Sequence, residues 1–409
     1  MDKKRFVITG GNFKNKGAQA MTFVTVSELR RVFPNCEIYM LSDVTESADM
    51  KAAMKFEVLN NRFMGWKYAR GGFETYTVIV RIAFSRLKGN NIDFKSIIDF
   101  KKVIKKADAI IDISGYALSS QWGYEATISY LNTIKTAKKL NIPMYIMPQS
   151  FGPFNYGEQQ DKVEKMIKRY MQYPQIIYAR EKYGYDELVE HFGLKNVKQA
   201  QDIVLQNKEI NKTDVFVKDI NNKKIILKTS KNVAIIPNMR NFDHGNRELI
   251  VELYIKVIRK LQGEGRSIYL IRHSFEDIEA CRIIYSSLTE KENVYLQEDD
   301  INCLEYEDLI KQFDFIIASR YHSIVHAYKM GVPAIILGWA EKYHSLAKIF
   351  KQQQFVFDVR ENIDIEKMIS DVNIMSLNYM EEKYVIQKEL KNVQKDNCFD
   401  YVYAHMRNW

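Results

Sequence analysis

One segment of the sequence combines the residue types that bind a small anion and move a proton. Residues 319–333 contain Arg320 and His322, two positions apart. A guanidinium group binds carboxylate and phosphate oxygens through paired hydrogen bonds, and an imidazole exchanges a proton near neutral pH. We expect both residues between a buried strand and the helix that follows it. There the helix dipole disfavours the imidazolium and so favours release of its proton.

His326 follows His322 by one helical turn, a spacing that two zinc ligands can have. A zinc site needs at least three protein ligands, and the sequence offers no third one. We therefore interpret His326 as a packed helix residue, and we expect neither a metal ion nor a cofactor.

Two other arginines follow predicted strands elsewhere in the chain, Arg180 in the first half and Arg240, two residues after Asn238, in the second. Strand ends from two facing sheets would direct both arginines into one cleft. For Arg180 a structural ion pair with Glu181 or Asp202 is an alternative, because buried arginines usually pair with carboxylates.

The loop after the first predicted strand, Gly-Gly-Asn-Phe-Lys-Asn-Lys-Gly-Ala at 10–18, includes Asn15 and Gly17. Glycines allow a sharp turn, and the N-terminus of the following helix offers unpaired N–H groups to an anion or a sugar hydroxyl. The spacing matches neither a Walker loop nor a complete dinucleotide fingerprint, so a plain strand-to-helix turn is the alternative.

Two more loops of the first half carry polar groups at strand ends. Ser114 and Gly115 follow one strand, and Gln149 and Ser150 follow the next. We expect these groups to share one rim of the sheet and to bind a polyhydroxylated substrate. The Gly-Pro pair at 152–153 is equally well explained as an ordinary turn.

Short apolar runs alternate with amphipathic stretches along the whole chain, a pattern typical of βαβ units and parallel sheets. The pattern predicts strands at 5–9, 36–41, 109–113, 142–147, 175–179, 232–236, 267–272, 293–296, 314–318 and 332–337. It predicts helices at 18–33, 124–140, 158–171, 181–192, 247–261, 276–288, 304–312, 322–330, 340–350 and 380–395. The fold class is therefore α/β, with two doubly wound Rossmann-like domains that face a cleft.

The alternation stops between residues 206 and 231, which we interpret as an inter-domain connector. We place an N-terminal, acceptor-side domain at 1–210 and a C-terminal, donor-side domain at 225–375. A helix within 376–409 is expected to pack back on the N-terminal domain.

Composition restricts the class of protein further. The chain has 409 residues, 46% of them hydrophobic, and 60 basic against 51 acidic side chains give a net charge of +9. The four cysteines have no CxxC spacing, no secretory signal or membrane-spanning segment is evident, and no nucleic-acid reader motif is present. We expect a cytoplasmic protein that does not bind nucleic acid.

One stretch, residues 62–88, has six basic side chains and one acidic side chain interleaved with aromatic residues. Basic residues attract anionic lipid headgroups, and aromatic rings settle at the membrane interface. Peripheral contact with the inner face of the cytoplasmic membrane is one interpretation, and a surface loop with a few core aromatics is the other.

The ordered set of motifs resembles the polysaccharide pyruvyl transferase family. The strongest element is Arg320-x-His322-x₄-Ala327-x₃-Gly331-x-Pro333. Weaker elements occur in the same order along the chain: Asn15-x-Gly17, Gly115, Gly152-Pro153-Phe154, Arg180-Glu181, Gln201-Asp202, Asn238-Met239-Arg240 and Asp277. The chain departs from the family in having Ala18-Gln19 after the early glycine, a single Gly115, and Glu181 in place of the usual aspartate.

The resemblance implies a fold similar to GT-B glycosyltransferases and a transfer of pyruvate from phosphoenolpyruvate onto a sugar as a cyclic ketal. The acceptor would be a unit of a surface polysaccharide, usually carried on a lipid. In this scheme His322 is the general acid, because protonation of the donor's methylene carbon needs an acid with a pKa near neutrality. Arg320, Arg240 and Arg180 would hold the donor, with Asn238 beside them, and Lys342 would add positive charge near the leaving phosphate.

On the acceptor side, the groups expected to bind are Asn15, Gly17, Ser114, Gly115, Gln149 and Ser150. Two other functions remain open. One is a GT-B glycosyltransferase that uses a nucleotide sugar, and the other is a non-catalytic scaffold or lipid-binding protein with the same fold.

Overall fold

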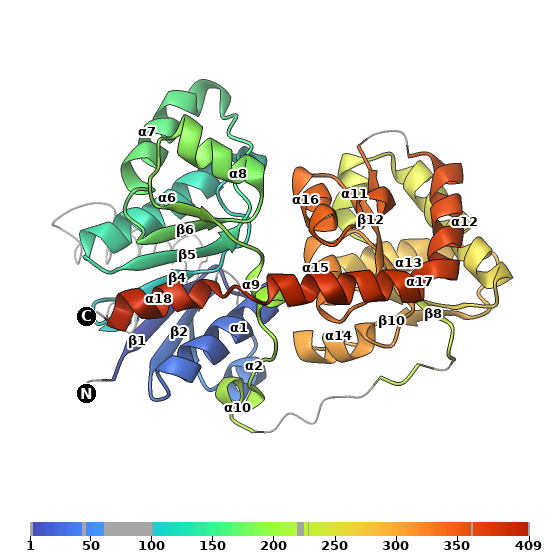
Figure 1. Cartoon of the computed structure of the whole chain (residues 1–409), viewed down its shortest axis with the longest axis horizontal. Coiled ribbons are helices and arrows are strands. Elements are labelled where there is room, and N and C mark those ends of the chain that lie inside the picture. The colour runs from blue at the N-terminus through green and yellow to red at the C-terminus, as the bar shows by residue number, and fades with distance from the viewer. Residues whose placement is uncertain are drawn as a thin grey trace, which may run out of the picture.

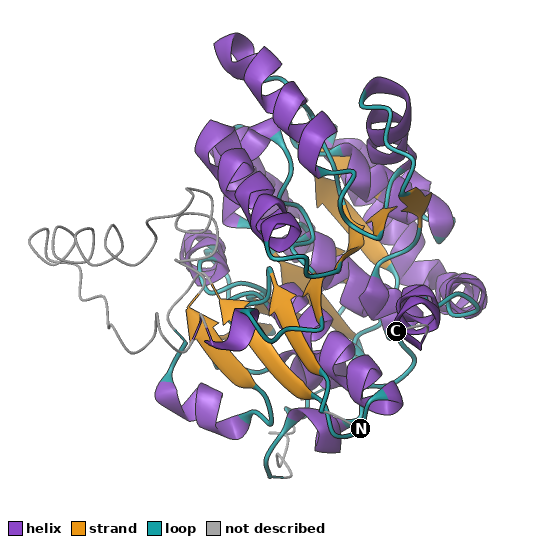
Figure 2. Ribbon diagram, turned by 90° about the vertical axis from the view of Figure 1, so that its left-hand side faces the viewer, coloured by secondary structure: helices purple, strands orange, loops and turns teal. Residues whose placement is uncertain are grey.

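Two parallel β-sheets, each covered by helices on both faces, form the framework of the molecule (Figures 1 and 2). The computed structural model describes residues 3–42, 46–60, 100, 102–218, 225–227, 229–360 and 363–407. The predicted basic-aromatic stretch 62–88 lies outside these residues. The predicted fold class, two doubly wound α/β sheets, is confirmed.

The first sheet has the strand order β3-β2-β1-β4-β5-β6-β7, and the order reverses between β1 and β4. Its strands are β1 (Arg5–Thr9), β2 (Glu37–Ser42), β3 (Glu57–Asn60), β4 (Ala109–Asp112), β5 (Met144–Gln149), β6 (Ile176–Ala179) and β7 (Val197–Gln199). Its helices are α1 (Lys16–Val32), α2 (Ala48–Ala53), α6 (Gly123–Lys139), α7 (Gln160–Tyr170), α8 (Lys182–Asp186), α9 (Ile203–Gln206) and α10 (Lys212–Val215). One turn of π-helix, Glu187–His191, continues α8.

The second sheet has the order β10-β9-β8-β11-β12-β13, which reverses between β8 and β11. Its strands are β8 (Asn232–Ile236), β9 (Ser267–Ile271), β10 (Val294–Gln297), β11 (Phe315–Ala318), β12 (Ala334–Gly338) and β13 (Val356–Asp358). The helices of this half are α11 (Met239–His244), α12 (Arg247–Gly263), α13 (Asp277–Ser287), α14 (Cys303–Ile310), α15 (Tyr321–Lys329) and α16 (Glu341–Ile349).

Burial on both faces explains why the strands read as continuous apolar runs. In β1, Phe6 and Ile8 pack into the core that contains α1, whereas Val7 packs into the core that contains α6 and α7. Successive side chains of a strand point to opposite faces, so both faces need apolar residues. The sheet is thereby fixed between two helical layers, and the loops that follow the strands lie at its carboxyl-terminal edge.

Two helices complete the chain, α17 (Ile365–Val393) and α18 (Cys398–Arg407). The long helix α17 packs against α12 and α15 and crosses towards the first sheet, where α18 lies (Figure 1). The hydroxyl of Tyr145 in β5 lies 2.7 Å from Nδ1 of His405 in α18. The chain end is thus attached to the first sheet.

Most predicted elements are present, with ends that shift by one or two residues. The exceptions are the short strands β3, β7 and β13 and the short helices α2, α9, α10 and α11, which were not predicted, and α17, which begins at Ile365 instead of 380. Asp364 caps α17 by accepting a hydrogen bond from the Lys367 backbone, a start signal that the sequence contains. The domain boundaries at 1–210, 225–375 and 376–409 stay a prediction.

Candidate active site

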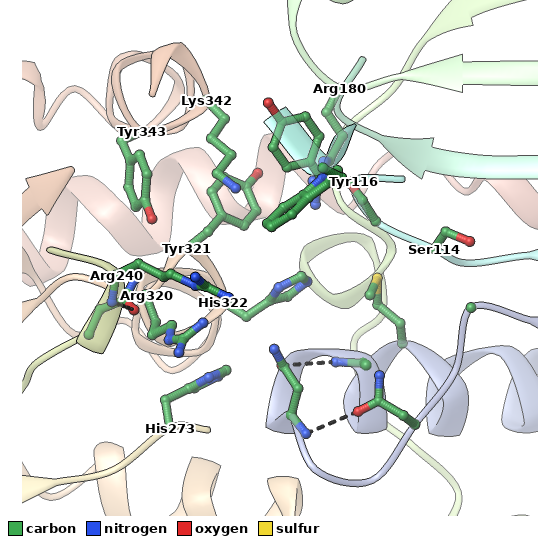
Figure 3. Close-up of a pocket in the computed structure, with 18 of the residues that line it drawn as sticks. Ser114, Tyr116, Arg180, Arg240, His273, Arg320, Tyr321, His322, Lys342 and Tyr343 are labelled. Atoms are coloured by element: carbon green, nitrogen blue, oxygen red, sulfur yellow. Dashed lines mark hydrogen bonds between the residues drawn. The ribbon is translucent and has the colours of Figure 1, made fainter. Parts of the chain in front are cut away.

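A cavity of about 280 Å³ lies where the carboxyl ends of the two sheets face each other (Figure 3). The loops after β1, β4 and β6 line it from one side, and those after β8, β9, β11 and β12 from the other. Both strand pairs at which the sheet order reverses, β1/β4 and β8/β11, therefore point into it. Ligands of open α/β sheets bind at such reversal points.

Arg320 is the N-cap residue of α15 and lines the cavity. Its Nε donates to Asp277 at 2.9 Å, and its Nη2 donates to Asp277 at 2.7 Å and to Glu276. Among the described residues, none accepts a hydrogen bond from Nη1. The two acidic side chains fix the guanidinium, and one edge of it is left for a ligand.

His322, the second residue of α15, crosses the cavity towards the first sheet (Figure 3). Its Nε2 lies 3.3 Å from Oδ2 of Asp202, too poorly aligned for a hydrogen bond but close enough for the carboxylate to stabilise the ring when it is protonated. Burial lowers the pKa of His322 below its usual value, and the charge of Asp202 opposes that shift. The imidazole is therefore mainly neutral in the free protein and poised to gain a proton when negative charge enters the cavity.

The ring of His322 lies directly on the backbone of Gly17 in α1. A Cβ atom at position 17 would be 2.2 Å from Cγ of His322, well inside van der Waals contact. Gly17 therefore does not offer a group to the cavity but leaves the space in which His322 lies. The acceptor role predicted for Gly17 has no support in this geometry.

Arg180 follows β6 and is almost fully buried at the cavity wall. Its Nη1 donates to Asp202 at 2.6 Å, and its Nη2 donates to the carbonyl of Gly115 at 2.5 Å and to Ser150 at 2.9 Å. The structural ion pair, one of the two interpretations open from the sequence, is present. Arg180 thus adds positive charge to the cavity, but both Nη atoms already have partners.

Arg240 and Asn238 lie on the opposite wall. Arg240 is half-exposed in α11, and its nearest acidic partner is Asp243 at 3.3 Å. Asn238 is the N-cap of α11: its side-chain oxygen accepts from the Arg240 backbone, and its amide donates to the carbonyl of Ser319. Arg240 can therefore turn towards a ligand, while Asn238 holds the loop.

Lys342 extends into the cavity from α16 through a group of aromatic rings. Its Nζ lies 4.6 Å from the ring centre of Tyr116, 5.2 Å from that of Trp339 and 5.5 Å from that of Tyr321. Burial, and then the charge of Arg180, lower the pKa of Lys342 to about 7. Its ammonium is attracted by the ring faces, but no acidic partner is bound to it among the described residues.

The loops of the first half are held by hydrogen bonds within that half and by one contact with the other half. Asn15 caps α1 and lines the cavity, and it pairs with Ser274 of the other half in an isolated β-bridge. Ser114 and Gly115 also line the cavity, and Ser114 donates to Asp112 at 2.7 Å. These three predicted acceptor residues are thus at the cavity.

Gln149 and Ser150 do not line this cavity. Gln149 is fully buried and donates to Asp112 at 2.9 Å and to the Tyr130 hydroxyl at 3.1 Å. Burial raises the pKa of Asp112, and hydrogen bonds from its neighbours oppose that shift. Gln149 therefore belongs to a buried polar network beneath the loops, a position that gives no support to its predicted acceptor role. Ser150 lines a neighbouring cavity.

Sequence reasoning missed several residues that line the cavity, including His273 and the aromatic group around Lys342. His273 follows β9 by two residues, is 1% exposed, and neither ring nitrogen has a hydrogen-bond partner among the described residues. Burial, then the charge of His326, lower its pKa far below the usual value. Because His273 follows a predicted strand, the sequence contained a signal by which it could have been found.

His326 packs in α15, with Nδ1 2.9 Å from Glu307.

The sequence profile described as "Polysaccharide pyruvyl transferase" matches residues 15–341, which include Arg180, Arg240, Arg320 and His322. No curated protein sequence matches the chain.

Solved structures share the fold at low sequence identity. A UDP-N-acetylglucosamine 2-epimerase is 12% identical, with a TM-score of 0.56, over 98% of this chain and 97% of its own. The UDP-GlcNAc 2-epimerase from Neisseria meningitidis bound to UDP-GlcNAc is 14% identical, with a TM-score of 0.54, over 96% and 100%. An α,α-trehalose-phosphate synthase (UDP-forming) from Burkholderia vietnamiensis is 10% identical, with a TM-score of 0.52, over 100% and 97%. The fold is that of GT-B glycosyltransferases and UDP-GlcNAc 2-epimerases.

Proposed function

Because the chain belongs to the polysaccharide pyruvyl transferase family, we propose that it moves pyruvate from phosphoenolpyruvate onto a sugar as a cyclic ketal. One observation carries this proposal. Arg320, Arg240 and Lys342 converge with His322 on one small cavity between the sheets. Phosphoenolpyruvate combines a carboxylate and a phosphate on three carbons, so its site needs several cations and an acid within a small volume.

In this proposal the donor lies against the open edge of Arg320, and Arg240 approaches from the exposed wall. Asp277 and Glu276 hold Arg320 before the donor arrives, so little conformational entropy is lost on binding. Lys342 faces the donor from its aromatic surroundings, where low solvent access strengthens its attraction for phosphate.

His322 supplies the proton for the methylene carbon. The donor's negative charge raises the pKa of the imidazole, which takes up a proton as the donor binds and gives it to carbon in the reaction. A sugar hydroxyl then attacks the positive carbon, phosphate leaves with the electrons of its C–O bond, and a second hydroxyl closes the ketal. The two hydroxyls release two protons: one restores His322 and the other leaves with phosphate.

The nucleotide-sugar alternative draws on the fold shared with the epimerases and the trehalose-phosphate synthase. Glycosyltransferases of this fold commonly bind sugar or ribose hydroxyls through a carboxylate near the start of the late helix. Here the start of α15 carries Arg320 and His322, a pair that suits a compact anion better than a diol. A non-catalytic scaffold would have no need for this pair.

The acceptor we propose is a sugar of a surface-polysaccharide precursor on a lipid carrier, modified at the cytoplasmic side of the membrane. No helix among the described residues is long and apolar enough to cross a bilayer. Contact with the membrane through residues 62–88 remains a prediction.

Mass spectrometry of glycans incubated with the protein and phosphoenolpyruvate tests this function. We expect products heavier by one pyruvate ketal, with release of one phosphate per ketal, and we expect His322→Ala to abolish both while it retains the wild-type fold. A wild-type protein that instead consumes UDP- or GDP-sugars would establish the alternative.

A further inference from the structure

A second cavity, of about 440 Å³, adjoins the first one. The two share Tyr116 and Lys342, whose side chains form the wall between them. The hydroxyl of Tyr116 lies 2.8 Å from the carbonyl oxygen of Gly152 and 2.7 Å from Oε1 of Gln121 and donates its one proton to either, so this wall has a fixed position. A molecule in the second cavity would therefore lie next to a donor in the first.

The second cavity has the surface that a saccharide needs. Tyr183, which is 44% exposed, and Pro153 give it apolar faces, and Ser150 and Glu341 give it polar groups. The ring of Tyr183 lies close to Gly152, where an added Cβ would be 2.9 Å from the ring. Sites for small molecules combine such apolar faces with a few placed polar groups, and a sugar ring presents both C–H faces and hydroxyls.

Glu181 is the acidic group best placed in this cavity. It follows β6, is 6% exposed, and its Oε1 accepts a hydrogen bond from Ser150 at 2.9 Å. Ser150 in turn accepts from Arg180, whose Nε lies 3.8 Å from the same carboxylate oxygen. Among the described residues, none donates to Oε2. The carboxylate is thus oriented through one oxygen, and the other is left for a ligand.

We propose that the second cavity binds the acceptor saccharide and that Glu181 is the catalytic base for its attacking hydroxyl, an inference that rests on the proposed function. The O–H bond breaks as Oε2 of Glu181 takes the proton, and the sugar oxygen forms a bond to the central carbon of the protonated donor. Phosphate then leaves with the electrons of its C–O bond and carries away that proton. The pyruvyl group crosses between the cavities beside Lys342.

Kinetics of Glu181→Gln, with Glu190→Gln as the matched control, test the role of Glu181. Glu190 is exposed on the same helical segment and lines neither cavity. The acceptor probes are methyl glycosides of glucose, galactose, mannose, N-acetylglucosamine and N-acetylmannosamine. We expect Glu181→Gln to bind phosphoenolpyruvate as tightly as wild type and to lose at least about 100-fold in transfer rate, the scale of general-base catalysis. Glu190→Gln should transfer at the wild-type rate.

Transfer by Glu181→Gln at the wild-type rate overturns the proposal, and so does a loss of phosphoenolpyruvate binding, which would place Glu181 in the donor site. Saturation-transfer NMR with the same glycosides tests the cavity without turnover. We expect at least one glycoside to bind wild type in the presence of phosphoenolpyruvate and at least 10-fold more weakly to Tyr183→Ala. If none binds or reacts, or if Tyr183→Ala binds equally well, the proposal is overturned. Failure of the wild type to bind phosphoenolpyruvate would instead refute the proposed function.

Discussion

Oδ2 of Asp202 lies 3.3 Å from Nε2 of His322, and the two residues come from the two halves of the chain. Asp202 follows the last strand of the first sheet, and its other oxygen accepts from the backbone of Val204 at 2.9 Å. Burial alone would raise the pKa of Asp202, but His322 in its protonated form and the guanidinium of Arg180 hold it well below its usual value. A fixed negative charge from one half of the chain thus faces the acid of the other half.

Asp202→Asn is expected to lower the pKa of His322 further. The carboxylate favours the imidazolium and opposes the effect of burial, so its removal shifts the pKa downwards. The protonated fraction at pH 7 falls, and the kcat profile moves to lower pH with about 10- to 100-fold loss at neutrality. NMR titration of the histidine ring protons and the pH–rate profile measure both effects. Asp186→Asn, which removes an exposed pair with Lys182, is the control; an unchanged His322 titration in Asp202→Asn would contradict this account.

Gly17→Ala is expected to disable the site without unfolding the protein. The added methyl group would be 2.2 Å from Cγ of His322, so the imidazole or α1 must move. A displacement near 1 Å at a catalytic group costs about 100-fold in rate. Gly263→Ala is the matched control, because a Cβ there meets nothing within 4 Å. Steady-state kinetics and circular dichroism compare the two variants, and wild-type activity in Gly17→Ala would show that His322 is not held there.

Lys342→Met should change stability in a pH-dependent way. The folded-state pKa of Lys342, about 7, lies below its ordinary value of 10.5, so the unfolded chain binds more protons between these limits. Below pH 7 the buried, charged amine therefore destabilises the folded state by its full amount. This destabilisation disappears as the pH rises towards 10.5. Urea unfolding should show the largest gain of Lys342→Met over wild type at pH 6 and a smaller gain at pH 9. A gain that is constant, or that grows with pH, would contradict the burial of this amine.

Gln149→Ala is expected to affect stability and not acceptor recognition. Its amide donates to the buried Asp112, and removal of one partner of a buried polar group costs about 1–3 kcal/mol. Urea unfolding measures that loss, and the KM for the acceptor should remain within about 2-fold of wild type. A large rise in that KM with unchanged stability would restore the acceptor role predicted from the sequence.

The periodicity of the chain was sufficient to predict both sheets and the edge at which the site lies. A parallel strand buried on both faces shows as a continuous apolar run, and the residues after it must reach the carboxyl edge. Arg320, His322 and Arg240 were found in this way, and all three line the cavity, as does Lys342, which the family resemblance implied. The short strands β3, β7 and β13 carry too few residues for a recognisable run.

What the sequence could not supply was the direction of individual side chains at strand ends. Gln149 is the last residue of β5 and turns into the core, whereas Ser150, one residue later, faces the second cavity. Adjacent positions face opposite sides, so an error of one residue in the strand end reverses the prediction. The contact of Gly17 with His322 and the rings around Lys342 join elements distant in sequence, which no local pattern encodes.

The central claim is that the cations between the two sheets bind phosphoenolpyruvate, and isothermal titration calorimetry tests it most directly. Wild type should bind phosphoenolpyruvate, with affinity that falls as salt rises, and should not bind UDP-GlcNAc. Arg320→Gln should bind it at least 10-fold more weakly, whereas Arg282→Gln, which alters an exposed pair with Glu298, should bind it as wild type does. Equal affinity in Arg320→Gln and wild type, or binding of UDP-GlcNAc in place of phosphoenolpyruvate, would contradict the account.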